Sequence, residues 1–224
     1  MSGRLLELSH PIRAGMETYP GLPGPAVTDF LSREASAARY AGGATFQIAR
    51  IDMVANTGTY VDAPFHRFAG RPDVAELPLE RLADLVGVVL DVSSRAGRAI
   101  GAETLDGLPV EGKAVLVRTD WDRHWGARAY FEGHPFLTRA AAAAFAAARP
   151  ALVGIDSLNI DDTADGERPA HTLLLGAGIP IVEHLCNLAA LPPTGFRLHA
   201  VPAPLHGVGS FPARVYAVLP TERR

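Results

Sequence analysis

The stretch from Asn56 to His66 constrains this chain more than any other segment. Asp62 and His66 lie four residues apart on either side of Pro64, and Gly58 precedes all three. Proline fixes one backbone angle and glycine permits a tight approach, so the stretch predicts a rigid loop rather than a helix. A rigid loop that carries both a carboxylate and an imidazole is suited to binding or catalysis.

Composition narrows the class of protein. The chain has 224 residues, 48% of them hydrophobic, which predicts one sizeable core and a single domain over 1–224. The net charge of -3 is spread without a basic stripe, so we expect no nucleic-acid partner. Cys186 is the single cysteine, which excludes an internal disulfide and fits a cytoplasmic protein. Residues 1–11 lack a signal-peptide pattern, and no apolar run is long enough to span a membrane.

Short apolar segments alternate with helical ones. The strand candidates are rich in Val, Ile and Leu and cover 5–9, 46–54, 86–92, 114–118, 152–155, 196–201 and 214–219. Helices are predicted from Pro78 to about Asp84, over the alanine-rich 139–149, over 171–175, and in a short piece after Glu183. Thr138 is placed to cap the alanine-rich helix. This mixture predicts an α/β fold.

A second polar segment follows one of the predicted strands. Residues 154–162 leave the strand in a polar loop, and His171 and Glu183 come after it. Loops at strand ends often line the sites of α/β proteins.

These two segments resemble the cyclase superfamily, which includes kynurenine formamidases and isatin hydrolases. The first resembles its signature His-Thr-Gly-Thr-His-x-Asp-x-Pro-x-His, with Asn56 and Tyr60 where the pattern has histidines. The run from His171 to Glu183 resembles the family's second metal-binding segment. The resemblance implies a swivelling β/β/α fold in which a mixed sheet curls toward a barrel, with helices around it.

The resemblance also implies a metal site and its limits. One metal-binding position of the family is formed by both histidines of the signature and its Asp. Of these three ligands, only Asp62 is present in this chain. The other takes Asp62, His171 and Glu183, a set that can hold one Zn²⁺ or Mn²⁺. Asparagine is a weak neutral ligand, and a phenol with a pKa near ~10 is a poor one. We therefore expect one divalent ion at most, and a site without metal is the alternative.

The remaining candidates are assigned to catalysis and substrate binding. His66 matches the family's catalytic histidine, and an imidazole titrates where proton transfer needs it; its alternative role is a hydrogen bond within the loop. Asn56 and Tyr60 are neutral donors that could stabilise an oxyanion or orient a substrate. The alternatives for both are a decayed site that binds something small, or simple pairing with backbone groups. Tyr19, Trp121, Trp125 and His134 are the candidate substrate contacts.

The expected protein is therefore a hydrolase of an amide, ester or lactone in a small cyclic or aromatic molecule. A metal-independent acid–base enzyme and a non-catalytic binding protein on the same scaffold remain as rival hypotheses. The resemblance further implies a homodimer or homotetramer.

Overall fold

A nine-stranded curled sheet organises the computed structural model, which describes residues 3–220. Its strands run in the order β1-β13-β11-β5-β7-β9-β10-β4-β12. Their bounds are β1 Arg4–Glu7, β4 Tyr60–Asp62, β5 Leu85–Asp91, β7 Ala114–Arg118, β9 Leu152–Ile155, β10 Ile181–Glu183, β11 Thr194–His199, β12 Ser210–Pro212 and β13 Tyr216–Leu219. The central strands β5, β7, β9 and β10 are parallel, and the flanking pairs are antiparallel.

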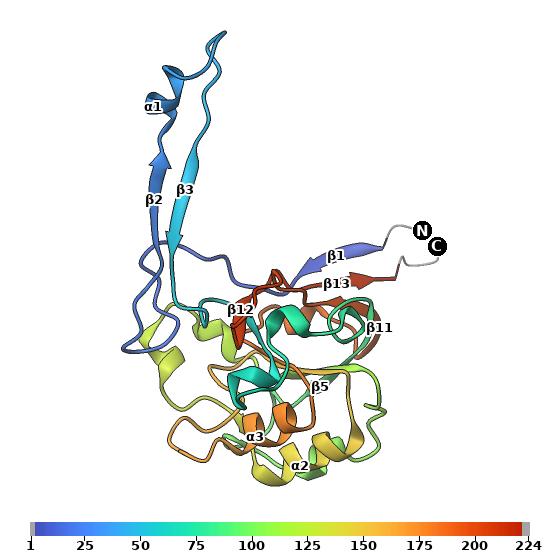
Figure 1. The fold of residues 1–224 in the computed structure, drawn as a ribbon. Helices are drawn as coiled ribbons and strands as arrows, with labels where there is room; N and C mark the ends of the chain where they lie inside the picture. The colour runs from blue at the N-terminus through green and yellow to red at the C-terminus, as the bar shows by residue number, and fades with distance from the viewer. Residues whose placement is uncertain (1–2, 221–224) are drawn as a thin grey trace.

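The pleat of the sheet divides the core in two. Val115 and Val117 of β7 pack with helices α2 (Arg139–Ala148) and α3 (Pro169–Gly176), which lie together on one face (Figure 1). Leu116, between them, belongs to the core on the other face. Successive side chains of a strand point to opposite faces, so a continuous apolar run serves both cores. Among residues 3–220, no helix is long and apolar enough to cross a membrane.

Helix α2 follows its predicted boundaries. The Thr138 side chain accepts a hydrogen bond from the Ala141 amide and caps the first turn. Arg149 adopts a left-handed conformation after the last turn, and Pro150 prevents continuation. Ala141 and Phe145 are buried, so the small side chains bring α2 close to its neighbours.

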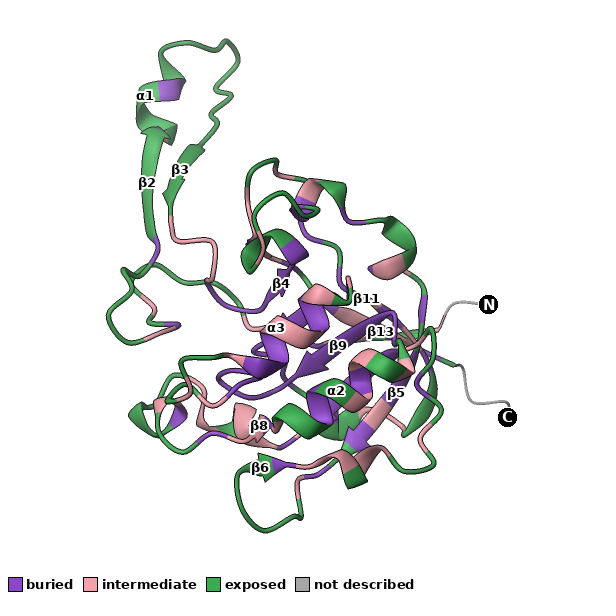
Figure 2. Ribbon diagram, turned by 60° about the horizontal axis from the view of Figure 1, so that its bottom comes forward, coloured by how far each residue is buried: buried purple, intermediate pink, exposed green. Residues whose placement is uncertain are grey.

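A hairpin arm projects from the body of the protein. It consists of β2 (Ala26–Leu31), the short helix α1 (Arg33–Ala37) and β3 (Ile48–Asp52). Figure 1 shows the arm extending away from the sheet, and Figure 2 shows it almost wholly exposed. Several large apolar side chains are exposed on it: Val27, Phe30, Tyr40, Phe46, Ile48 and Ile51. A two-stranded sheet β6 (Ala99–Ile100) and β8 (Phe136–Leu137) completes the structure.

The α/β class and the curled mixed sheet are confirmed, and most predicted strands lie where the sequence placed them. The helix predicted from Pro78 is wrong. Only the 3-10 turn Leu79–Arg81 forms there, because the backbone leaves the helical conformation at Leu82, with a φ of -127°, and Asp84 has a positive φ of 53°. The helix expected after Glu183 is replaced by the 3-10 turn Leu188–Ala190. The stretch predicted as a loop contains the strand β4, followed by the 3-10 turn Pro64–His66.

Candidate active site

The register of β4 with its two neighbours assembles the floor of the site. Glu183 of β10 lies opposite Tyr60, and Ser210 of β12 lies opposite Asp62. Val61, between Tyr60 and Asp62, points into the core on the other face. The period-two alternation therefore puts these polar side chains on the face of the sheet that α3 covers.

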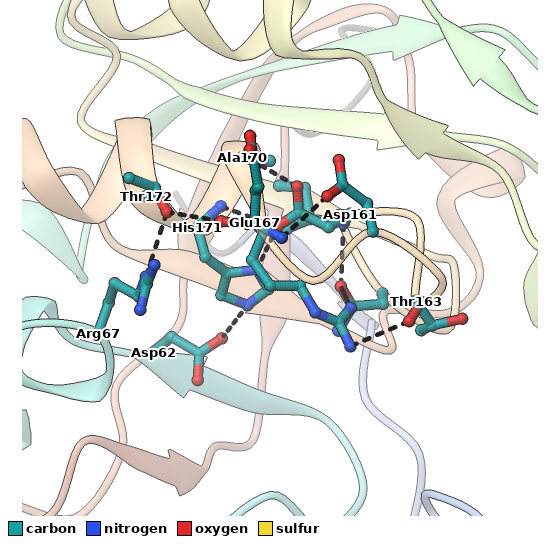
Figure 3. A network of polar contacts seen from close by, with 12 residues as sticks. Asp62, Arg67, Asp161, Thr163, Glu167, Ala170, His171 and Thr172 are labelled. Carbon is teal, nitrogen blue, oxygen red and sulfur yellow. Dashed lines mark hydrogen bonds and ion pairs between the residues drawn. The ribbon is translucent and has the colours of Figure 1, made fainter.

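Helix α3 supplies His171 in a fixed orientation. Asp161 accepts hydrogen bonds from the backbone amides of Ala170 and His171, which caps the helix. Its carboxylate also lies 2.6 Å from His171 Nδ1. The opposite ring nitrogen, Nε2, then faces two carboxylates, at 3.7 Å from Asp62 Oδ2 (Figure 3) and 3.7 Å from Glu183 Oε1.

A cavity of about 320 Å³ opens above this floor. It is lined by Tyr19, Leu22, Asn56, Tyr60, His66, Arg67, Asn159, Gly166, Arg168, His171 and Glu183.

One side of the cavity is a histidine cradle formed by Asp62, His66 and His171. Ser210 Oγ contacts Asp62 Oδ1 and lies 2.9 Å from His66 Nδ1, so one hydroxyl links the two residues. Asp62 is fully buried, and its second oxygen, Oδ2, has no hydrogen-bond partner. A buried carboxylate oxygen without a partner is costly and marks a place for a proton or a cation.

Electrostatics in the cradle favour a positive charge. Burial by itself lowers the pKa of His171, but the carboxylates of Asp161, Asp62 and Glu183 outweigh it and raise that pKa to about 10. Without a metal, the imidazole therefore carries a proton at neutral pH. A metal ion bound at Nε2 would displace that proton, because only the neutral ring is a ligand.

The other side of the cavity is a tyrosine cluster formed by Tyr19, Tyr60 and Asn159 around Glu183 Oε2. Tyr60 OH donates to Oε2 at 2.6 Å, and Asn159 Nδ2 donates to it at 3.3 Å. Tyr19 OH lies 3.1 Å from the same oxygen, donates to the Leu158 carbonyl at 2.7 Å and accepts from Asn159 at 2.8 Å. Glu183 Oε2 is therefore surrounded by neutral groups.

The phenols of the cluster stay protonated. Burial, followed by the charge of Glu183, raises the pKa of both Tyr19 and Tyr60 well above the usual value. Burial and the nearby charge of Asp62 also raise the pKa of Glu183, while His171 opposes them. Protonated phenols are donors and poor metal ligands.

The donor set fits one divalent ion in the cradle. Asp62 Oδ2 lacks a partner, and both carboxylate oxygens lie 3.7 Å from His171 Nε2. Ligand atoms around a tetrahedral ion with bonds of about 2.0–2.2 Å are separated by roughly 3.4 Å, which is close to that spacing. At this cavity, the set whose ligand atoms all lie within 4.8 Å of one another is Asp62, His66 and His171, and Glu183 is not part of it. Both possible sets contain Asp62 and His171.

The structure brings together seven of the ten residues singled out in the sequence. Six of them line the cavity and Asp62 lies in its floor; the six are Tyr19, Asn56, Tyr60, His66, His171 and Glu183. Trp121, Trp125 and His134 do not line it. Trp125 stacks on His10, the Trp121 indole donates to the Tyr130 carbonyl, and His134 is buried against the Asp161 carbonyl.

Four contributors were missed or left without a role. Ser210 pairs with a strand that is 148 residues away in the sequence, so no local pattern points to it. Asp161 and Asn159 lie in the polar segment after a predicted strand, which was a usable signal. Arg168 precedes α3 and has a positive φ of 49°, which the sequence does not indicate.

Comparison with known proteins identifies the family of this chain. The family described as Cyclase matches residues 6–162. Kynurenine formamidase of Bacillus cytotoxicus is 29% identical over 210 residues, covering 93% of this chain and 94% of that protein. A solved structure described as a potential metal-dependent hydrolase with cyclase activity is 28% identical, with a TM-score of 0.78 and 96% of each chain covered. Isatin hydrolase A from Labrenzia aggregata is 26% identical, with a TM-score of 0.77, 96% of this chain and 93% of that one covered. The chain therefore belongs to the cyclase family.

Proposed function

We propose that this cyclase-family hydrolase cleaves the amide bond of a small aromatic amide, such as a formyl group on an aromatic amine or an amide within a ring. One observation carries the proposal: His171 and the accessible His66 line a cavity with neutral donors, beside a buried Asp62 oxygen that has no hydrogen-bond partner. The similar kynurenine formamidase and isatin hydrolase support an aromatic amide as the substrate class.

Asp62, His171 and Glu183 would hold one Zn²⁺ or Mn²⁺. Such an ion polarises the amide carbonyl and lowers the pKa of a water molecule. Asp161 fixes the His171 ring so that Nε2 faces the two carboxylates. A carboxylate on the far nitrogen also makes the imidazole a better ligand.

His66 is proposed to move the proton of the reaction. Its Nδ1 lies 2.9 Å from Ser210 Oγ, which leaves Nε2 available to the cavity. Nε2 accepts a proton from the attacking water as the water oxygen bonds to the carbonyl carbon. The same proton then passes to the leaving nitrogen as the C–N bond breaks, so the products are a carboxylic acid and an amine.

The tyrosine cluster and Asn56 are proposed to orient the substrate. Tyr60 remains a neutral phenol, and Asn56 offers an amide to the same cavity. The amide of Asn56 is the neutral donor that would stabilise a developing oxyanion without binding a second ion. The single proton of Tyr60 is donated to Glu183 Oε2, so Tyr60 positions that carboxylate. This assigns Tyr60 and Asn56 a role that differs from metal ligation.

Activity and metal content together test the proposal. The purified protein is dialysed, its zinc and manganese are measured, and hydrolysis of formanilide is followed with and without a chelator. We expect one ion per chain and turnover that is lost on chelation and restored by the metal. Turnover that survives complete metal removal would instead favour metal-independent acid–base chemistry. Tight binding of anilides without turnover would favour a binding protein.

We also propose that the hairpin arm packs against a second copy of the chain in the cytoplasm. An isolated two-stranded hairpin is marginally stable in water, and this one exposes Phe30 at 76% and Ile51 at 60%. A dimer or tetramer would cover these side chains. Light scattering of the intact protein and of a variant with both residues changed to Ser tests this, since only the intact protein should be oligomeric.

A further inference from the structure

We infer that the substrate carries a carboxylate, which Arg67 and Arg168 bind at the cavity. The inference rests on the proposed function, because it adds a second binding point to the same site. Both arginines line the cavity. Each comes from a segment that also positions the cradle: Arg67 follows His66, and Arg168 immediately precedes α3.

Arg67 is held in place by a neutral partner. Its Nε donates to Thr172 Oγ1 of α3 at 3.1 Å (Figure 3). Among residues 3–220, no carboxylate oxygen lies within 4.0 Å of its guanidinium, which leaves the two terminal nitrogens without a charged partner. The side chain is exposed but oriented, which reduces the entropy lost on binding a ligand.

Arg168 is similarly without an ion pair in the described chain. Its two contacts are long, at 3.4 Å to Asn159 Oδ1 and 3.4 Å to the Thr163 carbonyl. Its sequence neighbour Glu167 forms an ion pair with Arg139 instead. The nearest acidic side chain in the sequence is thus committed elsewhere, and the Arg168 guanidinium remains available to the cavity.

The charged groups of the cavity therefore differ in burial. Asp62 and Glu183 are buried in the floor, whereas two unpaired guanidinium groups stand at its wall. Guanidinium is the side chain best matched to a planar carboxylate, since its N–H groups can donate in parallel. A substrate with an amide at one end and a carboxylate at the other would contact both the cradle and these guanidinium groups.

A matched pair of substrates tests the inference. Formanilide is neutral, and 4-formamidobenzoate is the same molecule with a carboxylate. We expect Arg67→Gln and Arg168→Gln each to lower kcat/KM for 4-formamidobenzoate by about ten- to hundredfold, mainly through KM. The readout is the ratio of kcat/KM for 4-formamidobenzoate to that for formanilide, which should fall by this factor in each variant. Lys in either position should restore part of the loss. Arg71→Gln is the control, because Arg71 donates to the Gly176 carbonyl and does not line the cavity.

The outcomes separate this inference from the proposed function. If formanilide is hydrolysed and neither arginine variant distinguishes the two substrates, the carboxylate site is overturned and the hydrolase stands. If neither substrate is hydrolysed, the proposed function fails, and calorimetric titration with 4-aminobenzoate and aniline decides the inference alone. Tighter binding of 4-aminobenzoate that disappears in both Gln variants supports it, and equal binding of the two probes overturns it.

Discussion

The histidine cradle and the tyrosine cluster lie side by side in one cavity, yet they balance charge in opposite ways. In the cradle, a buried oxygen of Asp62 has no hydrogen-bond donor and faces His171. In the cluster, Glu183 Oε2 is surrounded by the hydroxyls of Tyr19 and Tyr60 and the amide of Asn159. Glu183 spans both, because its Oε1 faces His171 and its Oε2 faces the phenols.

This difference indicates how replacing a metal-ligating histidine changes the charge balance of the neighbouring carboxylate. The family signature has imidazoles at the positions of Asn56 and Tyr60. A phenol at position 60 donates to the carboxylate that an ion would otherwise neutralise. The carboxylate of the cluster is therefore satisfied by neutral donors, whereas that of the cradle faces the positive charge of His171.

The largest expected effect comes from Asp62→Asn, which removes the charge of the cradle and keeps its shape. Loss of a direct ligand should weaken metal binding by more than the ten- to hundredfold typical of an outer partner. Turnover should fall with it. Elemental analysis and calorimetry of parent and variant measure metal binding, and an activity assay measures turnover. A parent protein that retains two ions per chain would contradict the expectation that only the cradle binds an ion.

Removing the imidazole that we assign to proton transfer should have the next largest effect. His66→Ala is expected to lower kcat by about a hundredfold or more and to leave the metal content unchanged. This variant also decides between the two possible ligand sets. If the metal is lost together with turnover, His66 is a ligand and not the proton carrier.

The third prediction concerns a double variant that adds histidine ligands at the tyrosine cluster. Asn56→His combined with Tyr60→His restores two imidazoles beside Asp62 and should raise the metal content from one ion per chain to two. Tyr60→His alone is the control, since a single added ligand should not hold the second ion. Metal content that stays at one in the double variant would show that the backbone here departs from the family geometry.

A smaller effect is expected from the hydroxyl that links Asp62 to His66. Ser210→Ala should lower kcat by about tenfold, because His66 loses the group that fixes its Nδ1. Ser210→Thr retains the hydroxyl and should recover most of the rate. An equal loss in both variants would assign Ser210 to packing alone.

The smallest effect concerns stability. Tyr60→Phe removes a donor to a buried carboxylate and should cost about 1.5–3 kcal/mol, and each 1 kcal/mol lowers Tm by about 2–4 °C in a chain of this size. Tyr130→Phe is the matched control, because Tyr130 OH meets His184, a neutral imidazole whose pKa burial lowers to about 3. Its cost should be about 0.5–1.5 kcal/mol. Equal losses of stability in the two variants would mean that the hydrogen bond to Glu183 Oε2 contributes no more than one to a neutral acceptor.

The sequence predicted the parts of the fold that depend on local pattern. Strands β7 and β9 and the capped helix α2 coincide with their predictions, since apolar runs and a Thr cap are local signals. Strand β4 was missed because three residues, two of them polar, do not form a recognisable run. Each strand of the site is short, and its partners decide its conformation.

The same distinction applies to the site. His171, Glu183 and Tyr60 were identified individually, but the hydrogen bond that joins Tyr60 to Glu183 depends on strand register. Trp125 was assigned to the pocket from its residue type, whereas it packs edge-on against Tyr130 and His184. Aromatic side chains near a site serve packing as readily as binding, and only tertiary structure separates the two.

The pairing of β4 with β12 has a consequence for how the protein is made. Ser210 contacts Asp62 across 148 positions of the chain, so β12 leaves the ribosome long after β4. Contacts between such distant segments close late in folding. The cradle is therefore incomplete until β12 has been synthesised and has paired with β4, and the proposed metal ion is expected to bind only after that step.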